Sequence, residues 1–230
     1  ALARALVSIG TAAGLRTEAF ITRMDTPLGR AVGNSVEIAE CIEVLSGKGP
    51  ADLSALIVRL ASRMVLLGGK ASNEAEAESR VRASLASGAA RDKLRQMIKW
   101  QGGDVAVVDD VKRLPSARHT HMVTASKAGY VSSLDALLVG RTPLALAAGR
   151  DKKSDPVDLS AGILLHKKPG EKVSAGESVM ALRYNDQSRL SGALALAGQA
   201  VIIGDTAPAE APLVMGWVHD AGEQMFVDGF

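Results

Sequence analysis

The stretch Thr22–Cys41, TRMDTPLGRAVGNSVEIAEC, carries the strongest structural signal in the chain. Between a short apolar segment typical of a β-strand and a segment with helical periodicity, it holds four turn-forming residues, Pro27, Gly29, Gly33 and Asn34. Glycine, proline and asparagine at such density indicate a loop whose backbone has a defined shape. Because α/β proteins commonly place functional sites on loops between a strand end and a helix start, we expect a site at this corner.

The composition disfavours several classes of protein. The 27 lysines and arginines nearly balance the 25 aspartates and glutamates, so a basic face for nucleic acid or a membrane surface is not expected. The single cysteine, Cys41, excludes an internal disulfide or a multi-cysteine metal site, and we expect it to be a small buried residue. No apolar run approaches the roughly 20 residues of a membrane span, and no cleavable signal is evident. A soluble cytoplasmic protein is therefore expected.

The sequence pattern changes near the middle of the chain and predicts two domains. Helical periodicity dominates residues 1–116, for example in the apolar stripe of residues 53–67. Residues 117–230 instead show short β-like segments separated by turns. We predict a helical and α/β part over 1–116 and an α+β domain over 117–230. The first residues already follow a helical pattern without a capping residue, which suggests a piece of a longer protein.

The residues themselves suggest a cation site at the corner. The loop Pro27–Gly33 offers backbone carbonyl oxygens, and Glu40 on the following helix is placed to fold back toward them. Carbonyl oxygens with one carboxylate suit a hard cation. In the competing interpretation, Glu40 is a solvent-facing helix residue, and Gly29 and Gly33 serve packing only. The loop lacks the Gly-Lys-Ser/Thr ending of a phosphate loop, so phosphate binding by this loop alone is not expected.

The later half contains a motif that suggests an alternative function. Residues 168–177, KPGEKVSAGE, lie between two apolar segments and resemble the turn of biotinyl and lipoyl carrier domains. Only Lys127 and Lys152 are candidates for a modified lysine, and neither lies in a Met-Lys-Met or Asp-Lys-Ala setting. The pair Lys167–Lys168 is either a solvated turn or a group that closes over an anionic substrate. A non-catalytic β-sandwich carrier or interaction module is the alternative from a different class.

Five segments, in the right order, resemble the pyrimidine nucleoside phosphorylase and thymidine phosphorylase family. They are MDTPLGRAVGNSVEIAECIEVLSGKGPADL (24–53), GAARDKLRQMIKWQGGD (88–104), AGYVSSLD (128–135), LAAGRDKKSDPVDLSAGILLHKKPGEKVSAGE (146–177) and ALRYND (181–186). The resemblance implies the C-terminal part of the large α/β domain of a class II nucleoside phosphorylase, followed by an α+β, barrel-sandwich-like region. It implies reversible phosphorolysis of pyrimidine (deoxy)nucleosides to the base and (deoxy)ribose 1-phosphate. A nucleoside monophosphate phosphorylase shares this architecture and is a second alternative.

The same resemblance implies where the functional residues lie. The family's catalytic and substrate-binding residues lie upstream of these segments, so we assign no catalytic or substrate-binding residue here and expect this chain alone to be inactive. Bacterial members bind a monovalent cation, usually potassium, through positions that correspond to the carbonyls of Leu28 and Ala31 and to Glu40; the other ligands come from the upstream phosphate loop. The resemblance further implies phosphate and a pyrimidine nucleoside as substrates, no organic cofactor, and a homodimer of the complete enzyme.

Overall fold

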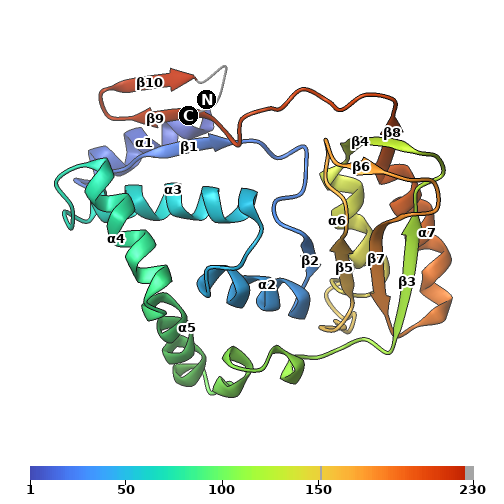
Figure 1. Ribbon diagram of the computed structural model, residues 1–230. Helices are drawn as coiled ribbons and strands as arrows, with labels where there is room; N and C mark the ends of the chain where they lie inside the picture. The colour runs from blue at the N-terminus through green and yellow to red at the C-terminus, as the bar shows by residue number, and fades with distance from the viewer. Residues whose placement is uncertain (151, 226–230) are drawn as a thin grey trace.

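The computed structural model describes residues 1–150 and 152–225, and Figure 1 shows their arrangement. Helices dominate the first half: α1 (Leu2–Ala12), α2 (Ser35–Leu45), α3 (Ala51–Leu67), α4 (Glu74–Ala86) and α5 (Ala89–Trp100), then the short 3-10 turns η1 (Val105–Val108) and η2 (Val111–Arg113). The second half adds α6 (Ala136–Ala145), η3 (Gln187–Arg189) and α7 (Leu190–Ala200). In the part of the chain that the structure describes, no helix combines the length and apolar character needed to cross a membrane.

In the described residues, the strands form three antiparallel sheets. The first has the order β1-β9-β10, from β1 (Ala19–Thr22), β9 (Val214–His219) and β10 (Gly222–Met225). The second has the order β2-β5-β7-β3, from β2 (Ala31–Gly33), β5 (Gly162–Leu165), β7 (Ser178–Tyr184) and β3 (His119–Thr124). The third has the order β6-β4-β8, from β6 (Lys172–Val173), β4 (Gly129–Leu134) and β8 (Val201–Gly204). Strand pairing thus crosses residue 116 twice, at β1–β9 and at β2–β5. This mixture of helices and antiparallel sheets agrees with the predicted fold class.

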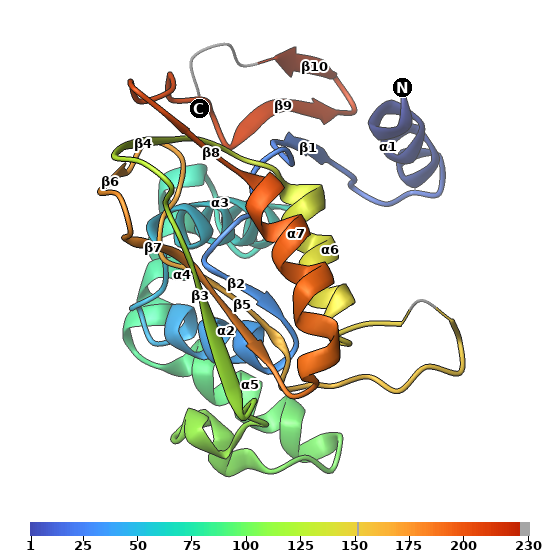
Figure 2. The same cartoon turned by 90° about the vertical axis from the view of Figure 1, so that its right-hand side faces the viewer.

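The main hydrophobic core lies where helices α6 and α7 cover the second sheet (Figure 2). Four of its largest side chains come from β5 and β7: Ile163, Leu165, Met180 and Leu182, each at most 2% exposed. Residues 179–182 of β7, which lies between β5 and β3, are buried in succession. Met180 and Leu182 belong to this core, whereas Val179 packs in a second cluster with Ala125 and Val173. Each such side chain contributes roughly 1.5–3 kcal/mol by burial, so this core fixes the position of β5 and of β2 beside it.

A cluster of charged and aromatic side chains attaches strand β9 to the helical part. Arg63 on α3 donates hydrogen bonds to both carboxylate oxygens of Glu18, at 2.6 and 2.9 Å, and its guanidinium lies 4.6 Å from the ring centroid of Trp217. The Trp217 indole N–H donates to the same carboxylate at 2.9 Å. Both partners of the ion pair are largely buried, so they hold β1, α3 and β9 in a fixed relation.

Candidate functional site at the Pro27–Ala31 corner

The residues Pro27–Ala31, called the corner below, lie between helices α2 and α3 and the turn that joins β5 to β6 (Figure 1). Gly29 has φ +67°, in the left-handed region that glycine adopts at little cost. A β-carbon on Gly29 would lie 2.3 Å from Glu40 Oε2 and 3.2 Å from Leu53 Cδ2. Position 29 therefore requires glycine for two reasons: its backbone angle is left-handed, and the Glu40 carboxylate packs against the space that a β-carbon would occupy.

Glu40 folds back from α2 onto the corner, as the sequence predicts. Its Oε1 atom accepts hydrogen bonds from the backbone N–H groups of Arg30, at 2.7 Å, and Ala31, at 3.1 Å. Burial raises the pKa of Glu40, and the nearby carboxylates of Asp52 and Glu43 raise it further, against the lowering by the two backbone hydrogen bonds. Within residues 1–150 and 152–225, Glu40 forms no ion pair. Glu40 is therefore a half-buried carboxylate without a cationic partner among these residues.

The strand register shows which way the Ala31 backbone faces. The Leu165 N–H donates to the Arg30 carbonyl at 2.7 Å, and Ala31 stands opposite Leu164. In an antiparallel pair, hydrogen-bonded and non-hydrogen-bonded positions alternate, so position 31 points its N–H and C=O away from β5. Because β2 is the edge strand of its sheet, the Ala31 carbonyl lies on the open side, together with the N–H that contacts Glu40.

Lys168 contacts the corner from the opposite side. This residue lies in the β5–β6 turn, and its ammonium donates hydrogen bonds to the carbonyls of Pro27 and of Gly29, the latter at 2.8 Å. It also forms an ion pair with Asp52 Oδ2 at 3.0 Å. Asp52 in turn accepts a hydrogen bond from the Gly29 N–H at 3.2 Å. The ammonium of Lys168 is thus already bound by oxygens of the same chain, which argues against a role of Lys168 in closing over an anionic substrate.

The Asp52 carboxylate is kept charged by its surroundings. Burial alone would raise its pKa, but the hydrogen bond and the charge of Lys168, together with two backbone hydrogen bonds, lower the pKa below the ordinary value. The backbone N–H groups of Leu53 and Gly29 act in the same direction. Arg30 adds a second link to the β5–β6 turn, since its guanidinium donates to the His166 carbonyl at 2.9 Å and forms an ion pair with Glu171.

The predicted cation ligands lie at this corner but not all in one place. Ala31 and Glu40 contact each other and line a hollow of about 490 Å³, together with Arg30 and Glu43. Leu28 lines the adjacent hollow of about 590 Å³, on the side of Asp52 and Lys168. Among the described residues, no group of three or more histidine, cysteine, aspartate or glutamate side chains is arranged to hold a metal ion. Any ligation at this corner would therefore depend on backbone carbonyls.

Two expectations from the sequence concern residues elsewhere. Cys41 is exposed, so the expectation of a buried cysteine is wrong; the buried face of α2 carries Ile42 and Val44 instead. Lys127, one candidate for a carrier lysine, lies in the turn between β3 and β4, with its ammonium 3.3 Å from Asp205 Oδ1. Lys152, the other candidate, donates its backbone N–H to Asp155 at 2.8 Å.

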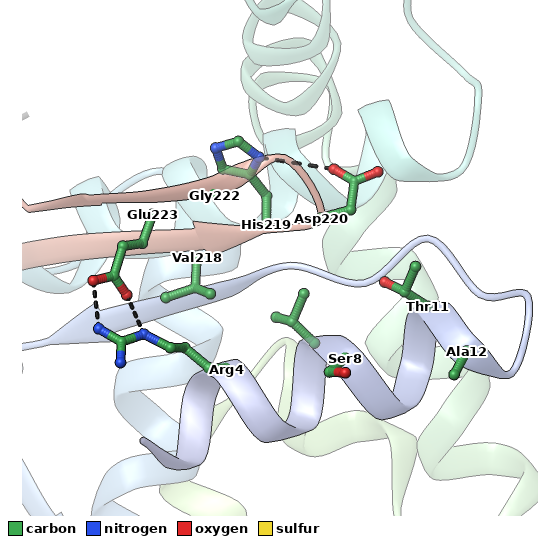
Figure 3. Close-up of a pocket in the computed structure, with 10 residues that line it drawn as sticks. Arg4, Ser8, Thr11, Ala12, Val218, His219, Asp220, Gly222 and Glu223 are labelled. Atoms are coloured by element: carbon green, nitrogen blue, oxygen red, sulfur yellow. Dashed lines mark hydrogen bonds and ion pairs between the residues drawn. The ribbon is translucent and has the colours of Figure 1, made fainter.

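A further hollow of about 550 Å³ lies between α1 and the β9–β10 hairpin (Figure 3). Arg4 closes one end through a two-fold hydrogen bond to Glu223, and His219 Nδ1 lies 3.7 Å from Asp220 Oδ1. The charged side chains of this hollow contact one another, and none of the residues that line it belongs to the corner. We assign no ligand to it.

Sequence reasoning missed Asp52 and Lys168. The sequence predicts Asp52 only as a residue that opens a helix, and Lys168 either as part of a solvated turn or as a group that closes over an anionic substrate. Their partners in the corner are distant along the chain, 23 residues for Asp52 with Gly29 and 141 for Lys168 with Pro27. No local pattern encodes such a contact, although both residues lie in segments, 24–53 and 146–177, that resemble the same family.

Comparison with known proteins places the chain in a family. The glycosyl transferase family a/b domain matches residues 1–91, and the pyrimidine nucleoside phosphorylase C-terminal domain matches residues 130–204. Pyrimidine-nucleoside phosphorylases of Staphylococcus aureus strains USA300, NCTC 8325 / PS 47 and N315 are each 44% identical over 187 residues, which is 81% of this chain. The chain spans only 43% of the length of these curated relatives. With both matched domains in this order, the chain belongs to the pyrimidine nucleoside phosphorylase family.

Proposed function

We propose that these 230 residues form the C-terminal part of a pentosyltransferase that catalyses reversible phosphorolysis of pyrimidine (deoxy)nucleosides. The products are the free base and (deoxy)ribose 1-phosphate, as in nucleoside salvage and catabolism. The observation that carries the proposal is the 44% identity over 187 residues to proteins named pyrimidine-nucleoside phosphorylase. Because the chain covers 43% of those relatives, the activity is proposed for the complete enzyme and not for this part alone.

In this reaction, a phosphate oxygen attacks the anomeric carbon, the glycosidic C–N bond breaks, and its electron pair leaves with the pyrimidine. The developing charges on the sugar and the base are stabilised by groups that the enzyme holds in place. We place these groups outside the described residues and assign to this chain a supporting role. The corner would form a rigid wall beside the substrate-binding half of the complete enzyme.

We further propose that the corner holds a potassium ion in the complete enzyme, through the carbonyls of Leu28 and Ala31 and the carboxylate of Glu40. Two observations support this assignment. Glu40 is half-buried and lacks a cationic partner among the described residues, and the Ala31 carbonyl faces the open edge of β2 beside it. Neutral carbonyls with one carboxylate suit a large monovalent ion. Bound there, the ion would neutralise Glu40 and brace the corner.

The complete enzyme is proposed to be a cytoplasmic homodimer that needs no organic cofactor. The balanced charge of the chain supports the absence of nucleic acid and membrane partners. Its substrates are proposed to be inorganic phosphate and a pyrimidine nucleoside.

The test is a phosphorolysis assay of the purified complete enzyme. Thymidine, uridine, CMP and UMP are incubated with and without inorganic phosphate, and release of the base is followed by chromatography. We expect phosphate-dependent release from a nucleoside, faster in potassium chloride than in choline chloride of equal concentration. Release from the monophosphates only would favour a nucleoside monophosphate phosphorylase, and no phosphate-dependent release would contradict the proposal. The 230-residue chain is the matched control and should be inactive.

A further inference from the structure

The Lys168 ammonium has the surroundings of a bound cation. Its donor atoms meet three oxygens, the carbonyls of Pro27 and Gly29 and the Asp52 carboxylate, so each of the three N–H groups has an acceptor. The side chain is 14% exposed, and that of Asp52 is 29% exposed. These oxygens belong to two elements, the corner and the start of α3, and the lysine comes from a third, the β5–β6 turn.

The oxygen set around Lys168 is of the same kind as the set proposed around potassium. Each consists of two backbone carbonyls and one carboxylate. An ammonium group is a compact point charge, and it can therefore occupy a site that also suits a monovalent ion. The two sites differ in the source of the cation. At the first site the cation is the ammonium of Lys168, which is part of the chain, whereas Glu40 has no cationic partner among the described residues.

We propose that Lys168 supplies the resident cation of an inner site formed by the Pro27 carbonyl, the Gly29 carbonyl and Asp52. In this arrangement Lys168 is a positioning residue: it fixes the carbonyls on either side of Leu28 and so shapes the corner. The existence of the inner site is independent of the enzyme's reaction. The role of Lys168 in shaping the potassium site rests on the proposed function.

If Lys168 occupies a cation site, its removal should have an effect that removal of an ordinary surface lysine would not have. When the lysine side chain is removed, the three oxygens remain and leave room for a cation from solution. Ammonium and potassium should then enter and restore stability, whereas tetramethylammonium is too large and has no N–H donor. A lysine that acts only by packing its apolar stem would show no such selectivity.

The experiment compares Lys168→Ala with Lys167→Ala by thermal unfolding of the 230-residue chain. Lys167 is the matched control because its ammonium also has partners, Glu177 at 2.6 Å and the Lys172 carbonyl at 2.8 Å, but does not touch the corner. Each variant is measured in ammonium chloride, potassium chloride and tetramethylammonium chloride of equal ionic strength. We expect Lys168→Ala to lower Tm by several degrees in tetramethylammonium and to regain at least half of this loss in ammonium and in potassium. Lys167→Ala should respond to the three salts equally.

The double variant Lys168→Ala/Asp52→Asn should lose the ammonium effect, because the carboxylate of the inner site is gone. Equal Tm values of Lys168→Ala in ammonium and tetramethylammonium would overturn the inner site. If Lys168→Ala does not fold in any salt, nuclear magnetic resonance of the unaltered chain decides. An ammonium held by three oxygens exchanges its protons slowly, so a lysine side-chain NH₃⁺ signal should be visible and should vanish in Asp52→Asn. Its absence from the unaltered chain would also overturn the inner site.

Failure of this inference differs from failure of the proposed function. Loss of the ammonium effect, with phosphorolysis and its potassium dependence intact, would remove only the inner site. An ammonium effect in a protein without phosphorolysis would leave the inner site standing and remove the proposed reaction.

Discussion

The two sides of the corner use the same kinds of atoms but differ in how their carboxylates are neutralised. On the inner side, Asp52 faces the Lys168 ammonium, and its pKa is lowered. On the outer side, Glu40 faces two backbone N–H groups without an ion pair in the described chain, and its pKa is raised. The comparison indicates two roles. A carboxylate that is neutralised by a lysine of the same chain stabilises the fold, whereas a carboxylate without a cationic partner is available to bind a ligand cation.

The glycine between the two sides should give the largest effect. Gly29→Ala combines an unfavourable left-handed backbone angle with a collision between its β-carbon and Glu40, so we expect a loss of about 3 kcal/mol in the free energy of unfolding. Gly47→Ala is the matched control, since Gly47 has φ +74° but open space around its β-carbon position, and it should lose only about 1 kcal/mol. Urea denaturation measures both. Equal losses would show that the contact with Glu40 does not constrain the corner.

Removing the inner carboxylate should cost less. Asp52→Asn breaks a largely buried ion pair, so we expect a loss of about 2 kcal/mol at neutral pH. Because the folded-state pKa of Asp52 is lowered, its contribution is present above the unfolded value of about 3.9 and disappears as the pH falls through the folded value. The difference between Asp52→Asn and the unaltered chain should therefore shrink in acid. A difference that persists at the lowest pH at which both fold would contradict this account.

Removing the outer carboxylate should affect the response to potassium more than the basal stability. In choline chloride, the free energy of unfolding of Glu40→Gln should lie within about 1 kcal/mol of that of the unaltered enzyme, because no cation stabilises the charged carboxylate there. In the complete enzyme, potassium at ten times its dissociation constant stabilises by about 1.4 kcal/mol, and this gain should be lost in the variant. Glu37→Gln is the control on the same helix: Glu37 contacts the Gly33 N–H and not the corner. An undiminished potassium effect in Glu40→Gln would remove Glu40 from the site.

The smallest effect is expected at a lysine far from the corner. Lys127 pairs with Asp205, and both side chains are well exposed, so Lys127→Ala should change stability by less than about 1 kcal/mol. Phosphorolysis by the complete enzyme should be unchanged. A biotinyl or lipoyl adduct on Lys127, found by intact-mass analysis of protein from the native host, would instead favour the carrier alternative.

Local features of the corner were predictable from the sequence, because they depend on residues close to one another. Pro27, Gly29 and Gly33 indicate a shaped loop, and Glu40 lies near enough along α2 to fold back onto it. The inner side was not predictable, because Lys168 reaches the corner only after β5 packs beside β2. The pairing of β1 with β9 is likewise encoded by packing between distant segments, through contacts such as that of Glu18 with Trp217.

The assignment of the outer side is tested most directly by locating a monovalent cation in crystals of the complete enzyme. Thallium(I) replaces potassium and scatters anomalously, so its position can be read independently of the protein atoms. We predict an anomalous peak in contact with Glu40 and with the carbonyls of Leu28 and Ala31, absent from crystals of Glu40→Gln. A complete enzyme that shows no peak there, or shows one between the carbonyls of Pro27 and Gly29 where Lys168 lies, would contradict the account.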